Sequence, residues 1–391
     1  MKPHIGILAL GFCAVLSAAE LPEERLHQHH VSSASPVQEA GVEQELIPSL
    51  TADVKDRADW YGRVRPQILA HWQKILGKVE PAPEDRKWFT DPTKAVVRQT
   101  TEEEGYTRTE LDLPLERDFL QHHVLLVPKG KGKGPFPAVI CWTSTTPDFK
   151  APEQWWGKWL TDHGYVVLTS WAFIRNYRDG STYKSGVSEK LYERFGHWLP
   201  VGKMVYDARQ EARYLASLPQ VDPERIGFMG FSLSGKSAIY VAAFAPEIKA
   251  TVAMDPQIAV NGTSNWYAPW YLDWLHPFPD IPTPQHTVLS LLDTNPRRPG
   301  FEHDHHELLA LTAPRPFLLI GGSLEEASTN GSDDLESWGY INRAREVYRL
   351  LGAEDKLRYV PTGDGHNANG PHIDPAWQSF LERWLKPLPG R

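Results

Sequence analysis

Residues 225–244, RIGFMGFSLSGKSAIYVAAF, decide the fold of this chain. The apolar run Ile226 to Met229 is too short for a helix and predicts a buried strand. The apolar run from Leu233 onward predicts a buried helix. Between the two, small residues stand two positions before and two positions after Ser232, as a sharp turn from strand to helix requires. Ser232 is therefore expected on a strained turn with its hydroxyl exposed.

Such a turn is a nucleophile elbow, G-x-S-x-G, here with Ser234 in place of the second glycine. Since the helix begins directly after the serine, the backbone N–H of Leu233 is expected to point to the position where an oxyanion would form. We predict Ser232 as a nucleophile and Leu233 as the first oxyanion donor.

Two later segments supply candidate partners for the serine. His366 follows the last predicted strand in a glycine-flanked loop, and an imidazole can take the serine proton near neutral pH. The acid that orients it is expected after the strand 315–320, where we choose Glu325 because it stands three residues past two glycines. Three neighbouring carboxylates and one after the preceding strand compete with it: Glu326, Asp333, Asp334 and Asp255.

The second oxyanion donor of such a site normally comes from the turn after the third strand. This turn spans residues 142–146, reads WTSTT and has no His-Gly-Gly. A backbone N–H from Thr143 to Thr145 can serve, and we take Ser144.

The order of the predicted elements gives the fold class. Early antiparallel strands are followed by strands that alternate with helices, which is typical of a mostly parallel sheet with helices on both faces. The predicted strands span 107–113, 120–127, 137–142, 165–170, 226–229, 248–254, 315–320 and 357–360. The predicted helices span 51–79, 154–163, 201–218, the run from 233, 337–351 and a last helix from 375. A serine on an elbow after a middle strand, with its partners later in the chain, is the order of the α/β-hydrolase fold.

The start of the chain and its charge bound the domain and its compartment. Residues 1–19 combine Lys2, a short apolar run and small residues at 17–19, so they predict a signal peptide and a periplasmic or secreted protein. Residues 20–50 predict a flexible leader, and residues 51–391 a single catalytic domain. Cys13 would leave with the signal, and Cys141 lies in a predicted strand, so no disulfide is expected. The net charge of −8, without a basic block or a second long apolar stretch, argues against nucleic acid and membrane partners.

An aromatic-rich insertion at about 257–300 stands between two core strands. Loops at the carboxyl ends of strands bind ligands in open α/β sheets, so we predict that Trp266 and Trp270 bind substrate, although the same aromatics could form a small core. The long, Tyr-rich segment 171–198 after the fourth predicted strand is the other candidate for the substrate pocket. Lys236 either reaches a sugar hydroxyl or pairs with a carboxylate. The cluster 303–306, HDHH, has metal-ligand spacing, but such a cluster also caps a helix, and we predict no metal.

Four motifs fix a resemblance to a known group of proteins. They are RIG at 225–227, the Ser-x-x-Gly-Lys that continues the elbow, HELLALTAPRP at 306–316, and GDGH at 363–366. Over roughly residues 106–385 the chain resembles secreted bacterial hydrolases of the dienelactone hydrolase and acetyl xylan esterase-like group. The resemblance implies a serine carboxylester hydrolase without metal or organic cofactor, often acting on esters that decorate plant polysaccharides.

The segment 230–236, GFSLSGK, is also similar to the Gly-x-Ser-x-x-Gly-Lys motif of glucuronoyl esterases. Those enzymes carry an arginine directly after the nucleophile, where this chain has Leu233. The leucine departs from the pattern of that family. The rest of the motif adds a glucuronate ester as an alternative substrate.

Three functions remain open from the sequence. The first is an exported serine esterase that forms an acyl-enzyme on a small-molecule or polysaccharide ester. The second is a peptidase or amidase with the same residues, and the third is a catalytically silent hydrolase fold that binds a carbohydrate or a protein. Reaction with a fluorophosphonate separates the first two from the third, because only an activated serine is labelled.

Overall fold

The computed structural model describes residues 47–386 except 79, 82, 146–150, 178–185, 260–265, 267–269, 273–303 and 326–330. The predicted signal peptide, nearly all of the leader and most of the 257–300 insertion lie outside the described residues. Trp266 and Trp270 of the insertion are described.

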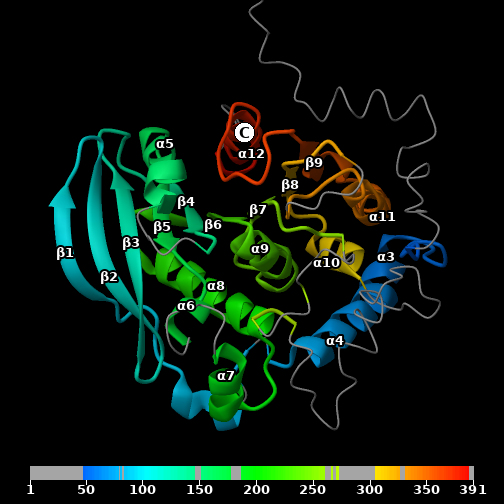
Figure 1. Cartoon of the computed structure of the whole chain (residues 1–391), viewed down its shortest axis with the longest axis horizontal. Helices are drawn as coiled ribbons and strands as arrows, with labels where there is room; N and C mark the ends of the chain where they lie inside the picture. Colours follow the sequence, from blue (N-terminus) through cyan, green and yellow to red (C-terminus); the bar gives the residue numbers. More distant parts are fainter. Residues whose placement is uncertain are drawn as a thin grey trace, which may run out of the picture.

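A nine-stranded sheet forms the centre of the molecule, with the strand order β1-β2-β3-β5-β4-β6-β7-β8-β9 (Figure 1). Strands β1 to β3 pair antiparallel, and β3 also pairs antiparallel with β5. From β5 to the β9 edge, every neighbouring pair is parallel. The strands are β1 Val96–Glu102, β2 Tyr106–Glu116, β3 Phe119–Pro128, β4 Phe136–Trp142, β5 Val166–Ser170, β6 Val221–Phe231, β7 Ala250–Met254, β8 Phe317–Gly321 and β9 Leu357–Pro361. The predicted mostly parallel sheet with an antiparallel N-terminal edge is confirmed.

Helices cover both faces of this sheet (Figure 1). On one face α8, α9 and α11 pack directly on the strands, and α4 and α10 pack on these helices within the same large apolar core. The other face packs against α5 and α12. The α-helices are α3 Arg57–Asp59, α4 Arg65–Leu76, α5 Lys158–Asp162, α6 Ile174–Tyr177, α7 Val187–Phe195, α8 Pro200–Ser217, α9 Leu233–Phe244, α10 His305–Thr312, α11 Ser337–Leu350 and α12 Ile373–Leu385. Shorter turns are the π-helical η2 Trp60–Val64 and η4 Glu153–Gly157 and the 3-10 helices η3 Pro83–Trp88 and η7 Glu354–Lys356.

The packed domain begins slightly before its predicted start at residue 51. Ile47 is buried in the core, and its carbonyl oxygen accepts a hydrogen bond of 2.6 Å from Nε of Arg343. Ser49 Oγ donates to a carboxylate oxygen of Glu346 over 2.6 Å. The predicted leader 20–50 is therefore wrong in its last residues, because these residues pack on α11.

Two properties of the core bear on the chemistry of the chain. Cys141, on β4, is a free thiol with no exposed surface. Within the described residues, no helix combines the length and the apolar character that a membrane span needs.

The parallel strands β4 to β9 all end at the same edge of the sheet, and the site described next lies along this carboxyl edge.

Candidate active site

The elbow between β6 and α9 holds Ser232 as the sequence predicts. Ser232 has φ 56° and ψ −111°, a left-handed conformation that costs a non-glycine residue of the order of 1–3 kcal/mol. Its N–H donates to the carbonyl oxygen of Met254 over 2.8 Å, which joins the elbow to β7. A Cβ at Gly230 would lie 2.3 Å from the carbonyl oxygen of Ser234, so the turn cannot accept a side chain there. Glycine at position 230 is therefore required by a close backbone contact.

His366 meets the serine from the loop after β9. Its Nε2 lies 2.9 Å from Ser232 Oγ, within hydrogen-bond distance. The loop reaches this position through Gly363 and Gly365, which have φ of 75° and 74°. The imidazole packs at 4.8 Å from the ring of Phe231, and its side chain is 30% exposed. A serine hydroxyl and an imidazole in this arrangement can exchange a proton.

Asp255 lies on the other side of the imidazole. Its Oδ2 is 3.2 Å from His366 Nδ1, an ion-pair contact that is longer than the bond on Nε2. Its Oδ1 accepts the N–H of Gly322 over 2.7 Å and that of Asp333 over 3.0 Å. Burial raises the pKa of Asp255, and the hydrogen bond from His366 acts in the opposite direction. The carboxylate is thus fixed by two backbone amides and aimed at the imidazole.

The prediction of Glu325 as the acid is wrong. Glu325 is exposed, and its carbonyl oxygen accepts the N–H of Leu335 within its own loop. The two glycines at the end of β8 do not carry a carboxylate to the imidazole; the second, Gly322, lets the chain pass between the histidine loop and Asp255. A Cβ at Gly322 would lie 2.0 Å from the carbonyl oxygen of Gly365. The competing Asp255, which follows β7 directly, is the acid that contacts the imidazole.

Asp333, another of the competing carboxylates, holds the loop that carries Asp255. Its carboxylate accepts the N–H of Gln257 over 2.5 Å and that of Ile258 over 2.8 Å. Asp255 and Gln257 have positive φ, 46° and 54°, so the two bonds stabilise a strained loop. Burial, and then the charge of Asp255, raise the pKa of Asp333 to about 6.

The turn after β4 provides the candidate for the second oxyanion donor. The N–H of Thr143 already donates to Ser170 over 3.0 Å, which leaves the amides of Ser144 and Thr145 from the predicted three. Ser144 is buried and Thr145 is exposed. Ser234 Oγ donates to the carbonyl oxygen of Thr143, so the elbow and this turn are directly connected. Leu233 is the first residue of α9, and its N–H therefore has no acceptor within the helix.

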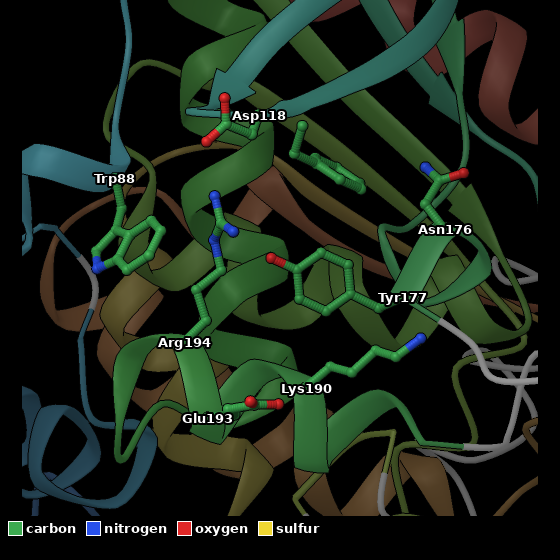
Figure 2. Close-up of a pocket in the computed structure, with 8 residues that line it drawn as sticks. Trp88, Asp118, Asn176, Tyr177, Lys190, Glu193 and Arg194 are labelled. Carbon is green, nitrogen blue, oxygen red and sulfur yellow. The ribbon is translucent and has the colours of Figure 1, made fainter.

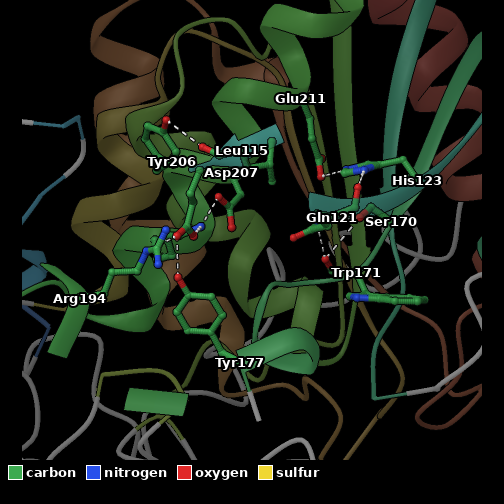
Figure 3. Close-up of polar contacts among 12 residues, drawn as sticks. Leu115, Gln121, His123, Ser170, Trp171, Tyr177, Arg194, Tyr206, Asp207 and Glu211 are labelled. Atoms are coloured by element: carbon green, nitrogen blue, oxygen red, sulfur yellow. Dashed lines mark hydrogen bonds and ion pairs between the residues drawn. The ribbon is translucent and has the colours of Figure 1, made fainter. Parts of the chain in front are cut away.

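The buried carboxylate of Glu211 holds the end of β4, next to the same turn, by hydrogen bonds. Glu211 Oε2 accepts the indole N–H of Trp142, the last residue of β4, over 2.6 Å. Its other oxygen lies 2.7 Å from Nε2 of His123 on β3 (Figure 3). The end of β4 is thus tied to α8 and β3 by hydrogen bonds as well as by packing.

The three predicted substrate contacts have different surroundings. Trp266 is fully buried, and its indole N–H donates to Gln257 O over 2.8 Å. Lys236 is 4% exposed; its Nζ donates to Pro256 O over 2.5 Å and lies 4.5 Å from the ring of Trp266. Burial lowers the pKa of Lys236 to about 7. As substrate contacts, Trp266 and Lys236 are corrected to parts of a small core behind the acid loop, whereas Trp270 is half-buried and stays a prediction.

The histidine-rich cluster before α10 is structural where it is described. Asp304 caps the helix by accepting the N–H of His305 over 2.6 Å. The ring of His305 lies 2.8 Å from Ile258 O and 3.1 Å from Tyr240 Oη, and burial lowers its pKa to about 3. His303 lies outside the described residues. Within the described part of the chain, no group of three or more potential ligands could hold a metal ion.

Comparison with known proteins gives a family and relatives. The family model described as "Glucuronyl esterase, fungi" matches residues 121–352, more than half of the chain. The hydrolase YtaP of Bacillus subtilis is 28% identical over 238 residues, which are 58% of this chain and 67% of the relative. The 4-O-methyl-glucuronoyl methylesterase 1 of Wolfiporia cocos is 26% identical over 171 residues, which are 42% of this chain. The chain matches only 40% of the length of that methylesterase.

A solved structure shows the same fold over a larger part of the chain. A glucuronoyl esterase from Solibacter usitatus superposes with a TM-score of 0.62 and 17% identity, covering 86% of this chain and 96% of that one. This likeness confirms the predicted fold class. The resemblance to carbohydrate esterases stated from the motifs is confirmed by the family match.

Proposed function

This chain belongs to the glucuronyl esterase family, and from this membership we propose that it hydrolyses carboxylic esters of carbohydrates through a serine acyl-enzyme. One observation carries the proposal: the imidazole of His366 contacts both Ser232 Oγ, at 2.9 Å from Nε2, and the carboxylate of Asp255, at 3.2 Å from Nδ1. The order nucleophile, acid, histidine along the chain is that of α/β-hydrolases.

The geometry supports the following steps. His366 Nε2 takes the proton of Ser232 as Oγ attacks the ester carbonyl, and the nearby carboxylate of Asp255 stabilises the imidazolium that forms. The backbone N–H groups of Leu233 and Ser144 receive the oxyanion. The imidazolium gives its proton to the departing alcohol, and the same histidine then activates the water that hydrolyses the acyl-enzyme.

We propose a uronic acid as the acyl part of the ester. The family match supports this choice, as do relatives that are themselves named glucuronoyl methylesterases. An acetyl ester is the second candidate. The observation in its favour is Leu233, an apolar and buried side chain where the resembling glucuronoyl esterases carry an arginine.

Hydrolysis of three substrates tests the proposal: methyl glucuronate, an aryl acetate and acetylated xylan. The protein is compared with Ser232→Ala, His366→Ala and the control His163→Ala, which removes an exposed histidine from the end of α5. We expect about 10³-fold or greater loss for the first two variants and none for the control. Faster cleavage of methyl glucuronate supports the uronate ester, and faster cleavage of the acetates supports the second candidate.

Fluorophosphonate labelling decides between an enzyme and a binding module. Labelling of the wild-type protein but not of Ser232→Ala supports an activated serine. An intact protein that is neither labelled nor active on any of the three esters would refute the proposed function. Cleavage of an amide analogue at a rate comparable with the ester would favour a peptidase or amidase.

We also propose that residues 1–19 are removed during export. The support is the short apolar run with small residues at 17–19. N-terminal sequencing of the protein secreted by its host should find Glu20 first, and a mature chain that starts at Met1 would contradict the proposal.

A further inference from the structure

A second pocket lies away from Ser232, on the side of α7. It has a volume of 490 Å³, within the usual range of small-molecule sites. Its walls come from η3, from the turn between β2 and β3, and from α6 and α7 (Figure 2). Tyr177 stands in its middle, Asp118 reaches in from the β2–β3 turn, and Lys190 reaches in from α7 (Figure 2).

This pocket lies at the same edge of the sheet as the candidate active site. Strand β3 is antiparallel to β5, so its first residue, Phe119, lies beyond the carboxyl end of β5. Helix α6 begins four residues after that end, at Ile174. On the neighbouring helices, Ser237 Oγ of α9 lies 2.9 Å from the sulfur of Met204 in the first turns of α8. Three strand spacings separate β6 from β3, which is about 14 Å.

A buried cluster of charges fixes the wall of the pocket. Glu116, at the end of β2, has no exposed side-chain surface, and its carboxylate accepts a hydrogen bond of 2.7 Å from the Tyr177 hydroxyl. Its carboxylate also lies 2.9 Å from Arg194 Nε and 2.8 Å from Lys203 Nζ. Lys203 also pairs with Asp207 one turn further along α8. Buried ion pairs contribute little net stability because of their desolvation cost, so this cluster serves geometry more than stability.

The pocket surface combines aromatic rings with charges of both signs. The ring of Phe119 packs edge-to-face on Tyr177 with the centroids 5.1 Å apart, and the Arg194 guanidinium lies 4.3 Å from the centroid of Trp88. Two acids, Asp118 and Glu193, and two bases, Lys190 and Arg194, also line the pocket. The balance of charges disfavours an anion or a cation as ligand. Carboxylates accept hydrogen bonds and ammonium groups donate them, so together they match a ligand with neighbouring hydroxyl groups, which do both. The apolar C–H faces of such a ligand match the aromatic rings.

We propose that this pocket is a second subsite that binds a pyranose residue of the polysaccharide part of the ester substrate. The inference rests on the proposed function, because it assigns the pocket to the same substrate that is cleaved at Ser232. The pocket and Ser232 are separated along the carboxyl edge of the sheet. The pocket is therefore assigned to a sugar of the polysaccharide and not to the ester group that reacts at Ser232.

Kinetics on a long and a short substrate test the inference. A double variant, Asp118→Asn with Lys190→Ala, changes two exposed residues at the rim of the pocket. The matched control is Glu189→Gln, because Glu189 is an exposed acid of α7 that does not line the pocket. For a xylo-oligosaccharide that carries the ester, we expect KM to rise about 3- to 10-fold with kcat unchanged, the effect of losing one or two hydrogen bonds. For a small aryl ester, KM and kcat should both stay at the wild-type values, and Glu189→Gln should match the wild type on both substrates.

Direct binding keeps this test separate from the proposed function. Xylohexaose without an ester is titrated calorimetrically into the Ser232→Ala protein with and without the two rim substitutions. A Kd that rises 3- to 10-fold supports the subsite, even if the intact protein cleaves no ester and the proposed function fails. An unchanged Kd and an unchanged KM on the long substrate would overturn the inference, as would an equal loss on the small aryl ester.

Discussion

The loops that follow β7 and β8 both carry carboxylates, yet only one brings its acid to the imidazole. The chain after β7 is buried over residues 255–259, and it turns at once through positive φ at Asp255 and Gln257. The loop after β8 first leaves the core, exposing Glu325, and then returns to bury Asp333 under the β7 loop. A place after a strand is thus not sufficient for an orienting acid. The carboxylate must also be desolvated and held by backbone amides.

Removal of the β7 acid should have the largest effect. For Asp255→Asn we expect kcat to fall by about 10³- to 10⁴-fold, because the imidazole loses the group that fixes its orientation and stabilises its positive charge. Steady-state kinetics on an aryl ester measure this loss, and thermal unfolding checks that the variant folds. Activity within tenfold of wild type would show that another carboxylate orients His366.

The crossing point of the two loops should be nearly as sensitive. Gly322→Ala places a Cβ 2.0 Å from the carbonyl oxygen of Gly365, so the histidine loop must move. A displacement of about 1 Å at a catalytic group can cost about 10²-fold in rate, and we expect a loss of that size in kcat. Gly62→Ala, where a Cβ meets nothing within 4 Å, is the control. Equal activity of the two variants would contradict the proposed positions of the loops.

Asp333, the acid that holds the β7 loop, should affect how the free energy of unfolding depends on pH. The pKa of Asp333 is raised from 3.8 to about 6, so between these values the native state holds a proton that the unfolded state has lost. The free energy of unfolding should therefore fall as the pH rises from about 4 to 6, by at most about 3 kcal/mol. In Asp333→Asn this fall should be smaller, as measured by denaturant unfolding at both pH values. An equally steep fall in the variant would assign the titration to other groups.

The exposed acid of the β8 loop should matter least. Glu325→Gln should keep kcat within about twofold of wild type and the free energy of unfolding within about 0.5 kcal/mol, because its side chain lies in solvent. The same kinetic and unfolding measurements test this. A large loss of activity would restore Glu325 as a functional residue.

The sequence predicted the serine, the histidine and the sheet because each has a local signal. The elbow around Ser232 and the glycines before His366 are backbone requirements that appear directly as residue types. The choice among the acids depends on how loops fold over one another, and single positions such as Glu325 and Asp255 carry no record of burial. Strand β1 was missed because its side chains are mostly exposed and show no alternation.

The helix α7 was not predicted within the Tyr-rich segment 171–198, although it had a usable signal. Val187, Leu191 and Phe195 recur at a spacing of four and form the buried face of that helix. The cluster around Glu116 and Lys203 could not be foreseen, since its members are far apart in the chain and are joined only by the packing of β2 on α8. The second pocket depends on this long-range contact and so on the fold as a whole.

The sealed thiol of Cys141 has a practical consequence. Under the proposed removal of residues 1–19 it would be the sole sulfhydryl of the chain, and it lies inside the sheet with no exposed surface. A cysteine introduced at the exposed position of Glu189, next to the pocket lining but not part of it, would then be the one site open to a maleimide dye in the native protein. Its emission would follow sugar arrival at that rim in real time, independently of whether any bond is cleaved.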